Sequence, residues 1–152
     1  MVLVFGIVNL SLAPIKKVFL GDAGSLLFGF LMSWILIYFS QPPVDLLHPI
    51  VALWCVAMPV FDSLIVITLR LREGRSPFSS DRLHFHHVLI DSGMNSWVAL
   101  VAILAVSITI TFIGIWITYT FSPIIGLIGY LGVFLACWLF YFSYCRLRRF
   151  GP

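Results

Sequence analysis

The stretch from Trp97 to Thr120 reads WVALVAILAVSITITFIGIWITYT and contains no charged residue. A helix that crosses a hydrocarbon core of about 30 Å, at 1.5 Å per residue, needs about 20 apolar residues. We therefore predict a membrane-spanning helix here, and the stretch indicates an integral membrane protein.

Three further segments meet the same criterion or nearly do, and they run from about Ser25 to Ser40, from Pro49 to Leu69 and from Pro123 to Tyr144. We expect an all-α bundle of four full spans, of which the first is short and includes part of a turn at Gly21–Gly24. The apolar stretch Met1 to Ala13 is too brief to cross and does not have the basic start or cleavage site of a signal peptide. We interpret it as the end of a partial helix.

The composition excludes several classes of protein. Of the 152 residues, 61% are hydrophobic and 10% are charged, and the mean hydropathy is +1.09. A soluble domain has roughly 45–50% apolar and 25% charged residues. These values exclude a soluble globular protein and a disordered chain, and no basic stripe suggests a nucleic-acid partner. The three cysteines have no paired spacing, so we expect small buried hydrophobic side chains rather than disulfides.

The nine Lys and Arg residues indicate the orientation of the chain. They fall on residues 14–24, on residues 70–96 and on the tail after the last span, whereas residues 41–48 and 121–122 contain none. The positive-inside rule assigns such loops to the cytoplasm. We therefore expect the loops 14–24 and 70–96 to face the cytoplasm together, and a site for polar substrates to lie on that face.

The first loop carries one carboxylate between two glycines, in Gly21-Asp22-Ala23-Gly24-Ser25. Glycine lets a ligand approach the backbone closely. Ser25 can serve as the N-cap of the following helix, whose free amides favour an anion. Asp22 could hold Mg²⁺, which proteins usually bind with one or two carboxylates plus substrate phosphates. In the alternative interpretation Asp22 only caps the helix.

The second loop combines arginines with three histidines, among them Arg75, Asp81, Arg82, His84, His86 and His87. If a helix begins after Ser80, His84 and His87 share a face, whereas in an extended segment His84 and His86 share a side. A zinc site is disfavoured because no cysteine or second carboxylate is close. A solvated basic loop is an alternative, but arginines and imidazoles best suit a phosphate or diphosphate.

Asp62 lies inside the predicted span from Pro49 to Leu69, where a carboxylate costs roughly 2.5–3.5 kcal/mol on insertion scales. It is either a functional group facing the bundle or a cleft, or a packing residue bonded to a neighbouring helix. His48 is expected to be an interfacial residue. Gly126, Gly129 and Gly132 recur every three residues and are expected to let another helix approach closely.

Three motifs together resemble a known family: FLGDAGS at residues 19–25, SPFSSDR at residues 76–82 and HFHH at residues 84–87. In this order they are similar to bacterial undecaprenyl-phosphate N-acetylglucosamine-1-phosphate transferases, of the polyprenyl-phosphate hexosamine-1-phosphate transferase superfamily. The resemblance covers nearly the whole chain. It implies transfer of N-acetylhexosamine 1-phosphate from a UDP-amino sugar to a polyprenyl phosphate lipid in the bacterial inner membrane, which starts a cell-envelope polysaccharide.

The resemblance also implies roles for residues. Asp22 would bind the metal, Mg²⁺ or alternatively Mn²⁺, and act in catalysis with His84 and His86. By the same resemblance Asp81 and Arg82 would take part in substrate binding. From the residue types and their positions, we expect five further residues to bind substrate: Gly24, Ser25, Asp62, Arg75 and His87.

The chain departs from the family because it has no adjacent aspartate pair, which full-length members carry on earlier loops. We therefore expect residues 1–152 to be the C-terminal portion of such an enzyme. This portion would need the missing N-terminal half and would be inactive alone. A homodimer is a further possible assembly. One alternative is a non-catalytic membrane protein that binds lipid phosphate or a partner bundle. A weaker one is a cation transporter that uses Asp62 and the histidines.

Overall fold

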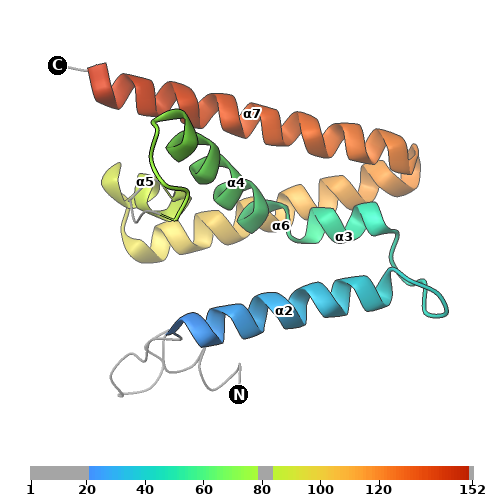
Figure 1. Ribbon diagram of the computed structural model, residues 1–152. Helices are drawn as coiled ribbons and strands as arrows, with labels where there is room; N and C mark the ends of the chain where they lie inside the picture. The colour runs from blue at the N-terminus through green and yellow to red at the C-terminus, as the bar shows by residue number, and fades with distance from the viewer. Residues whose placement is uncertain (1–20, 79–83, 151–152) are drawn as a thin grey trace. The chain divides into compact units, whose positions relative to one another are not determined.

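The computed structural model describes residues 21–78 and 84–150, and the side chains of residues 23–78 and 84–145. Every regular element in these ranges is a helix, which confirms the predicted all-α class (Figure 1). The predicted partial helix at Met1–Ala13 lies outside the described residues. The chain divides into two compact units, residues 1–46 and residues 47–152.

The first unit contains α2 (Gly21–Phe39). The helix ends as predicted, where the Ser40 hydroxyl donates to the Ile37 carbonyl (3.1 Å) shortly before a pair of prolines. Its start differs from the prediction, because Gly21–Gly24 is helical rather than a turn and Ser25 lies inside the helix instead of at its N-cap. In an apolar segment a helix satisfies its own backbone polar groups, which outweighs the cost of roughly 1 kcal/mol for each glycine.

The predicted span from Pro49 to Leu69 is two helices, α3 (Pro49–Cys55) and α4 (Ala57–Arg72), which are bent by 71° around Val56. The expectation of one continuous helix is therefore wrong. Pro59 explains the break, because proline has no N–H for the Cys55 carbonyl and its ring clashes with that carbonyl. The bend turns α4, which carries Asp62, out of the line of α3 (Figure 1).

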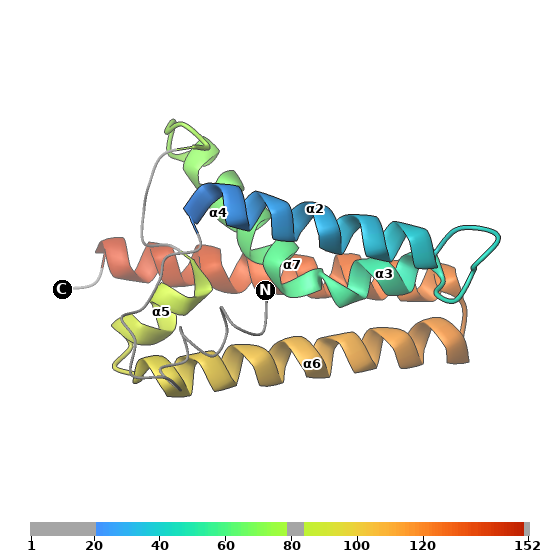
Figure 2. The same cartoon turned by 90° about the horizontal axis from the view of Figure 1, so that it is seen from below.

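Two long helices form a hairpin in the second unit, α6 (Ser96–Thr120) and α7 (Pro123–Phe150). The Asn95 side chain accepts a hydrogen bond from the Trp97 N–H (3.1 Å) at the start of α6, and the Ser122 hydroxyl accepts one from the Ile125 N–H (3.2 Å) at the start of α7. Polar caps at both starts agree with the predicted boundaries. The two helices run side by side, with the bent pair α3–α4 against them (Figures 1 and 2).

By length and composition, α6 and the part of α7 from Pro123 to Cys145 can each cross a membrane. The bent pair α3–α4 makes a third candidate if it counts as one span, and Ala23–Phe39 is a shorter apolar helix. The described residues therefore belong to a helical membrane protein with two or three candidate spans.

The core of the second unit is built around aromatic side chains of α3, α4 and α7. Trp54 is 1% exposed and meets Tyr130 edge to face at 5.4 Å between ring centroids, and Phe61 lies 4.8 Å from the same Tyr130 ring. Such pairs add about 0.5–1.5 kcal/mol beyond the area that they bury. This core fixes the helix that carries Asp62 against α7.

The predicted glycine stripe on α7 is only partly a close-packing surface. A Cβ at Gly126 would lie 2.4 Å from Thr118 Oγ1, so the helices do approach closely there. At Gly129 the nearest neighbour would be 3.6 Å away, and at Gly132 nothing lies within 4 Å. The expectation is therefore confirmed at Gly126, and at Gly132, where no described residue lies within 4 Å of a Cβ, it stays a prediction. Among the described glycines the least room is at Gly114 on α6, where an added Cβ would overlap the Trp54 indole.

Candidate active site

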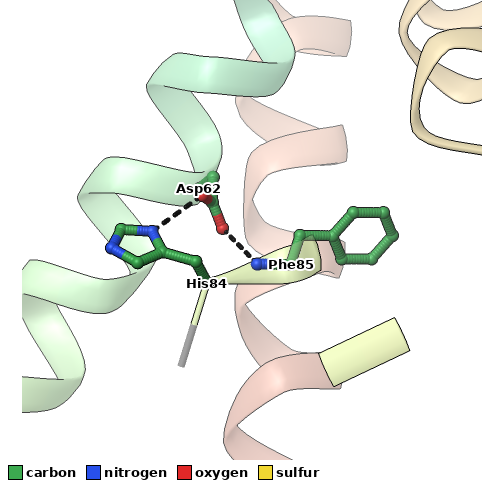
Figure 3. Close-up of polar contacts among 3 residues, drawn as sticks. All are labelled: Asp62, His84 and Phe85. Carbon is green, nitrogen blue, oxygen red and sulfur yellow. Dashed lines mark hydrogen bonds and ion pairs between the residues drawn. The ribbon is translucent and has the colours of Figure 1, made fainter. Parts of the chain in front are cut away.

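Asp62 and His84 are brought together by α4 and by the start of α5 (Phe85–Asp91). His84 Nδ1 lies 2.9 Å from Asp62 Oδ2, and the Phe85 N–H donates to Asp62 Oδ1 at 2.8 Å (Figure 3). The side chain of Asp62 is 21% exposed and that of His84 is 35% exposed. The carboxylate of Asp62 thus binds the start of α5, and each of its two oxygens accepts one hydrogen bond.

The conformation of the histidine segment combines the two expected alternatives. His84 is the N-cap of α5 with extended backbone angles (φ −64°, ψ 148°), and the helix begins at Phe85. The rings of His84 and His86 are stacked at 6.0 Å between centroids, and the His86 and His87 rings are 4.1 Å apart. Because His84 is not helical, its ring contacts that of His86, as expected for an extended segment, rather than that of His87. Since the His86 ring also contacts the His87 ring, all three imidazoles form one cluster.

Crowding in this cluster affects proton binding. Partial desolvation lowers the pKa of His86 below its ordinary value of 6.5, and the positive charges of His87 and His84 lower it further, while Asp62 opposes the change. His87 Nδ1 is buried and has no hydrogen-bond partner among the described residues. Neighbouring imidazoles therefore disfavour protonation of His86.

A tyrosine from α7 adds a polar atom beside the cluster. The Tyr141 hydroxyl is buried and has no hydrogen-bond partner among residues with described side chains. The Tyr141 ring lies 6.1 Å from that of Phe85, the residue whose N–H binds Asp62. Sequence reasoning missed Tyr141, since a tyrosine in an apolar helix carries no signal that separates it from an interfacial aromatic residue.

The arginines of the loop have different surroundings. Arg70 is 8% exposed, and its Nη1 donates to the Pro77 carbonyl at 2.6 Å. Arg75, predicted to bind substrate, forms an ion pair with Glu73 and is exposed. Arg72 lies 4.7 Å from the centre of the Trp138 ring. The buried Arg70 thus ties the loop that follows α4 to the end of that helix. The sequence did not single out Arg70 from the other arginines of this loop.

For several predicted site residues the structure gives no position relative to Asp62 and His84. Asp81 and Arg82 lie outside the described residues, and Asp22 is described only as a backbone position in α2. Gly24 and Ser25 belong to α2 in the first unit. Among the side chains that the structure describes, no group of three or more His, Cys, Asp or Glu residues could hold a metal ion. The described residues therefore do not by themselves form a metal site.

Relatives of the chain carry one name. An undecaprenyl-phosphate alpha-N-acetylglucosaminyl 1-phosphate transferase of Haemophilus influenzae is 42% identical over 107 residues, which cover 70% of this chain and 30% of that protein. Proteins of the same name from Yersinia pestis and Escherichia coli O157:H7 are 41% and 39% identical over 133 and 132 residues, in each case 87% of this chain and 35% of the relative.

No protein-family model matches the sequence, and no solved structure matches it. The chain spans about a third of the length of the curated relatives it matches. The aligned residues nevertheless make up most of this chain, from 70% to 87% of it. The chain is therefore homologous to about a third of the undecaprenyl-phosphate alpha-N-acetylglucosaminyl 1-phosphate transferases.

Proposed function

We propose that this chain is the C-terminal portion of a transferase that moves N-acetylglucosamine 1-phosphate from a UDP-sugar to undecaprenyl phosphate in the bacterial inner membrane. The observation that carries the proposal is the 41% identity over 87% of the chain to a curated transferase of that name. The chain aligns with 35% of that relative, which supports the proposal that it is one portion of an enzyme and needs the rest of it. Four spans with a cytoplasmic site are part of the proposal.

The chemistry of the histidine cluster supports the same function. Both proposed substrates carry phosphate, and their mutual repulsion must be offset at the site of transfer. Imidazoles near neutral pH can donate to phosphate oxygens or accept their protons. His84 and His86 are proposed to act in catalysis, while His87 and Arg75 are proposed to bind substrate. Asp81, Arg82, Gly24 and Ser25 are proposed to complete the substrate site.

Mg²⁺ is proposed as the cofactor, with Asp22 as its ligand from this chain. A single carboxylate is a poor Mg²⁺ site unless other carboxylates or phosphates assist, and the described side chains offer no further cluster. The proposal therefore requires further metal ligands from the remainder of the enzyme.

The test is a chimera in which this chain replaces the aligned third of the Yersinia pestis relative. Membranes that contain the chimera are supplied with UDP-N-acetylglucosamine, undecaprenyl phosphate and Mg²⁺, and the lipid-linked product and UMP are measured. We expect turnover by the chimera and none by the 152-residue chain alone. His84→Ala in the chimera is expected to lower kcat by about 10²-fold or more, the size typical of a lost acid–base group.

His48 offers a matched control, because it is the histidine outside the loop. Its Nδ1 accepts the Ile50 N–H at 3.2 Å as the N-cap of α3, and asparagine serves equally well at an N-cap. His48→Asn is expected to leave turnover unchanged. A chimera that is abundant in the membrane but makes no product would instead favour a non-catalytic protein that binds lipid phosphate.

A further inference from the structure

We infer that Asp62 is a positioning residue, which holds His84 with Nδ1 protonated and Nε2 available to a substrate phosphate and which ties the start of α5 to α4. The inference rests on the proposed function and deepens it. It replaces the expectation that Asp62 binds substrate directly.

The contacts of the carboxylate carry the first step. Oδ2 lies 2.9 Å from His84 Nδ1, and Oδ1 accepts the Phe85 N–H at 2.8 Å. The side chain is 21% exposed. Charge-assisted hydrogen bonds to both oxygens offset the cost of placing a carboxylate within an apolar helix. The geometry of Asp62 is therefore that of a group that supports its neighbours.

The second step concerns the hydrogen on the imidazole. A carboxylate only accepts hydrogen bonds, so the bond to Asp62 requires that Nδ1 of His84 carries the hydrogen. In the neutral ring the lone pair then resides on Nε2, which points away from Asp62 (Figure 3). The His84 side chain is 35% exposed, and Nδ1, the other ring nitrogen, is the one bound to Asp62. Nε2 can accept a proton from a phosphate hydroxyl, and the resulting imidazolium is stabilised by Asp62.

The third step concerns the backbone. Asp62 accepts the first N–H of α5, and His84, the N-cap residue, supplies no side-chain cap of its own. A side chain from α4 thus performs the capping that normally comes from the N-cap residue. Because one carboxylate binds both the His84 ring and the Phe85 amide, it fixes the direction of the ring and the position of the helix together.

Asp62→Asn separates these two roles. The asparagine oxygen can still accept the Phe85 N–H, but its NH₂ group would face Nδ1 and require the opposite tautomer, with the hydrogen on Nε2. The first measurement is ¹⁵N NMR of the histidine rings of the purified 152-residue chain in detergent at pH 8.5. The signals of His84 are identified by their loss in His84→Gln.

We expect the Nδ1–H tautomer of His84 in the unmodified chain and the Nε2–H tautomer in Asp62→Asn. An Nε2–H tautomer in the unmodified chain, or a tautomer that Asp62→Asn leaves unchanged, would overturn the inference. This measurement needs no turnover, so its result remains valid even if the proposed transferase function is wrong.

The second measurement uses the active chimera. Asp62→Asn is expected to lower kcat by about 10²-fold with little change in KM, and to have no further effect in a His84→Gln background. Thr111→Val is the control, since it removes a different interhelical hydrogen bond, from Thr111 Oγ1 to the Trp54 carbonyl (3.1 Å), and should leave kcat unchanged. A raised KM at constant kcat would make Asp62 a substrate ligand, and additive losses would mean that it acts independently of His84; either result contradicts the inference.

Discussion

The indole Nε1 of Trp54 donates a hydrogen bond to the carbonyl oxygen of Gly126, 3.2 Å away, and so joins α3 to α7. The opposite side of the same indole lies against Gly114 on α6. Three helices therefore meet at one side chain that is 1% exposed. Because α3 ends one residue after Trp54, this contact also holds the bend that leads into α4 and Asp62.

Gly114→Ala is expected to destabilise the chain. The added Cβ would lie 2.0 Å from Cδ2 and 2.2 Å from Cγ of Trp54, so the indole or α6 must move. Overpacking of this kind costs typically about 1–3 kcal/mol. The check is the midpoint of thermal aggregation in detergent, followed by gel filtration.

Gly132→Ala is the matched control for this variant, because no residue that the structure describes lies within 4 Å of a Cβ at Gly132. Alanine is the better helix former by about 1 kcal/mol, so this midpoint should stay the same or rise. Equal losses in the two variants would contradict the packing assigned to Gly114.

Pro59→Ala is expected to reduce the 71° bend between α3 and α4. Alanine restores the N–H that can bond the Cys55 carbonyl and removes the ring that clashes with it. Spin labels at the exposed residues Leu53 and Leu71, in a background with all cysteines replaced by alanine, report the bend. Leu53 and Leu71 are 18 residues apart, so a straight helix would separate them by about 27 Å along its axis. In Pro59→Ala the distance between the two labels should lengthen toward that value.

Pro49→Ala is the control for the bend, since Pro49 is in the first turn of α3, where no intrahelical hydrogen bond is lost. Its label distance should match that of the unmodified chain. If Pro59→Ala also leaves the distance unchanged, the Trp54 contacts rather than the proline maintain the bend.

The sequence was informative where a single physical rule dominates. The long uncharged stretches of the sequence predicted α6 and α7. The capping residues Asn95 and Ser122 mark helix starts close to those expected. The same rule failed between Pro49 and Leu69, because average hydropathy does not register the missing N–H of Pro59. The N-cap assigned to Ser25 failed for a related reason, since capping preference is weaker than the need to pair backbone groups in an apolar segment.

The sequence singled out the residues of the candidate site by type, but it did not predict how they lie relative to one another. Asp62 and His84 were both identified as candidates, yet their hydrogen bond depends on the direction of α4 after the bend, which no local pattern encodes. The extended backbone of His84 and the buried hydroxyl of Tyr141 likewise follow from packing between distant segments. The placement of Asp22 relative to the histidines stays a prediction.

The protonation of His86 gives a prediction on pH. Its pKa is lowered by desolvation and by the charges of His87 and His84. The unfolded chain, with an ordinary pKa near 6.5, therefore binds more protons than the folded chain just below that pH, so stability falls as the pH drops through 6.5. NMR titration should give a midpoint for His86 below 6.5.

His87→Gln tests the cause of this shift, because it removes one of the charges that disfavour protonation of His86. The midpoint of His86 should rise in this variant. In Asp62→Asn it should fall, since the carboxylate favours the protonated ring. A midpoint at or above 6.5 in the unmodified chain would contradict the crowding of the cluster.

Arg70 and Arg72 are two residues apart and carry the same charge, but the structure predicts different consequences of replacing them. Arg70 is 8% exposed and its Nη1 donates to the Pro77 carbonyl at 2.6 Å, whereas Arg72 is exposed over the Trp138 ring. Arg70→Lys keeps the charge that orients the chain but lacks the planar fork of donors, so the loop loses its anchor to the end of α4. Hydrogen exchange of the amides of residues 73–78 should accelerate in Arg70→Lys and change little in Arg72→Lys. Equal exchange rates in the two variants would mean that the loop is held by charge alone, and the buried contact to Pro77 would then have no part in positioning the segment that leads to His84.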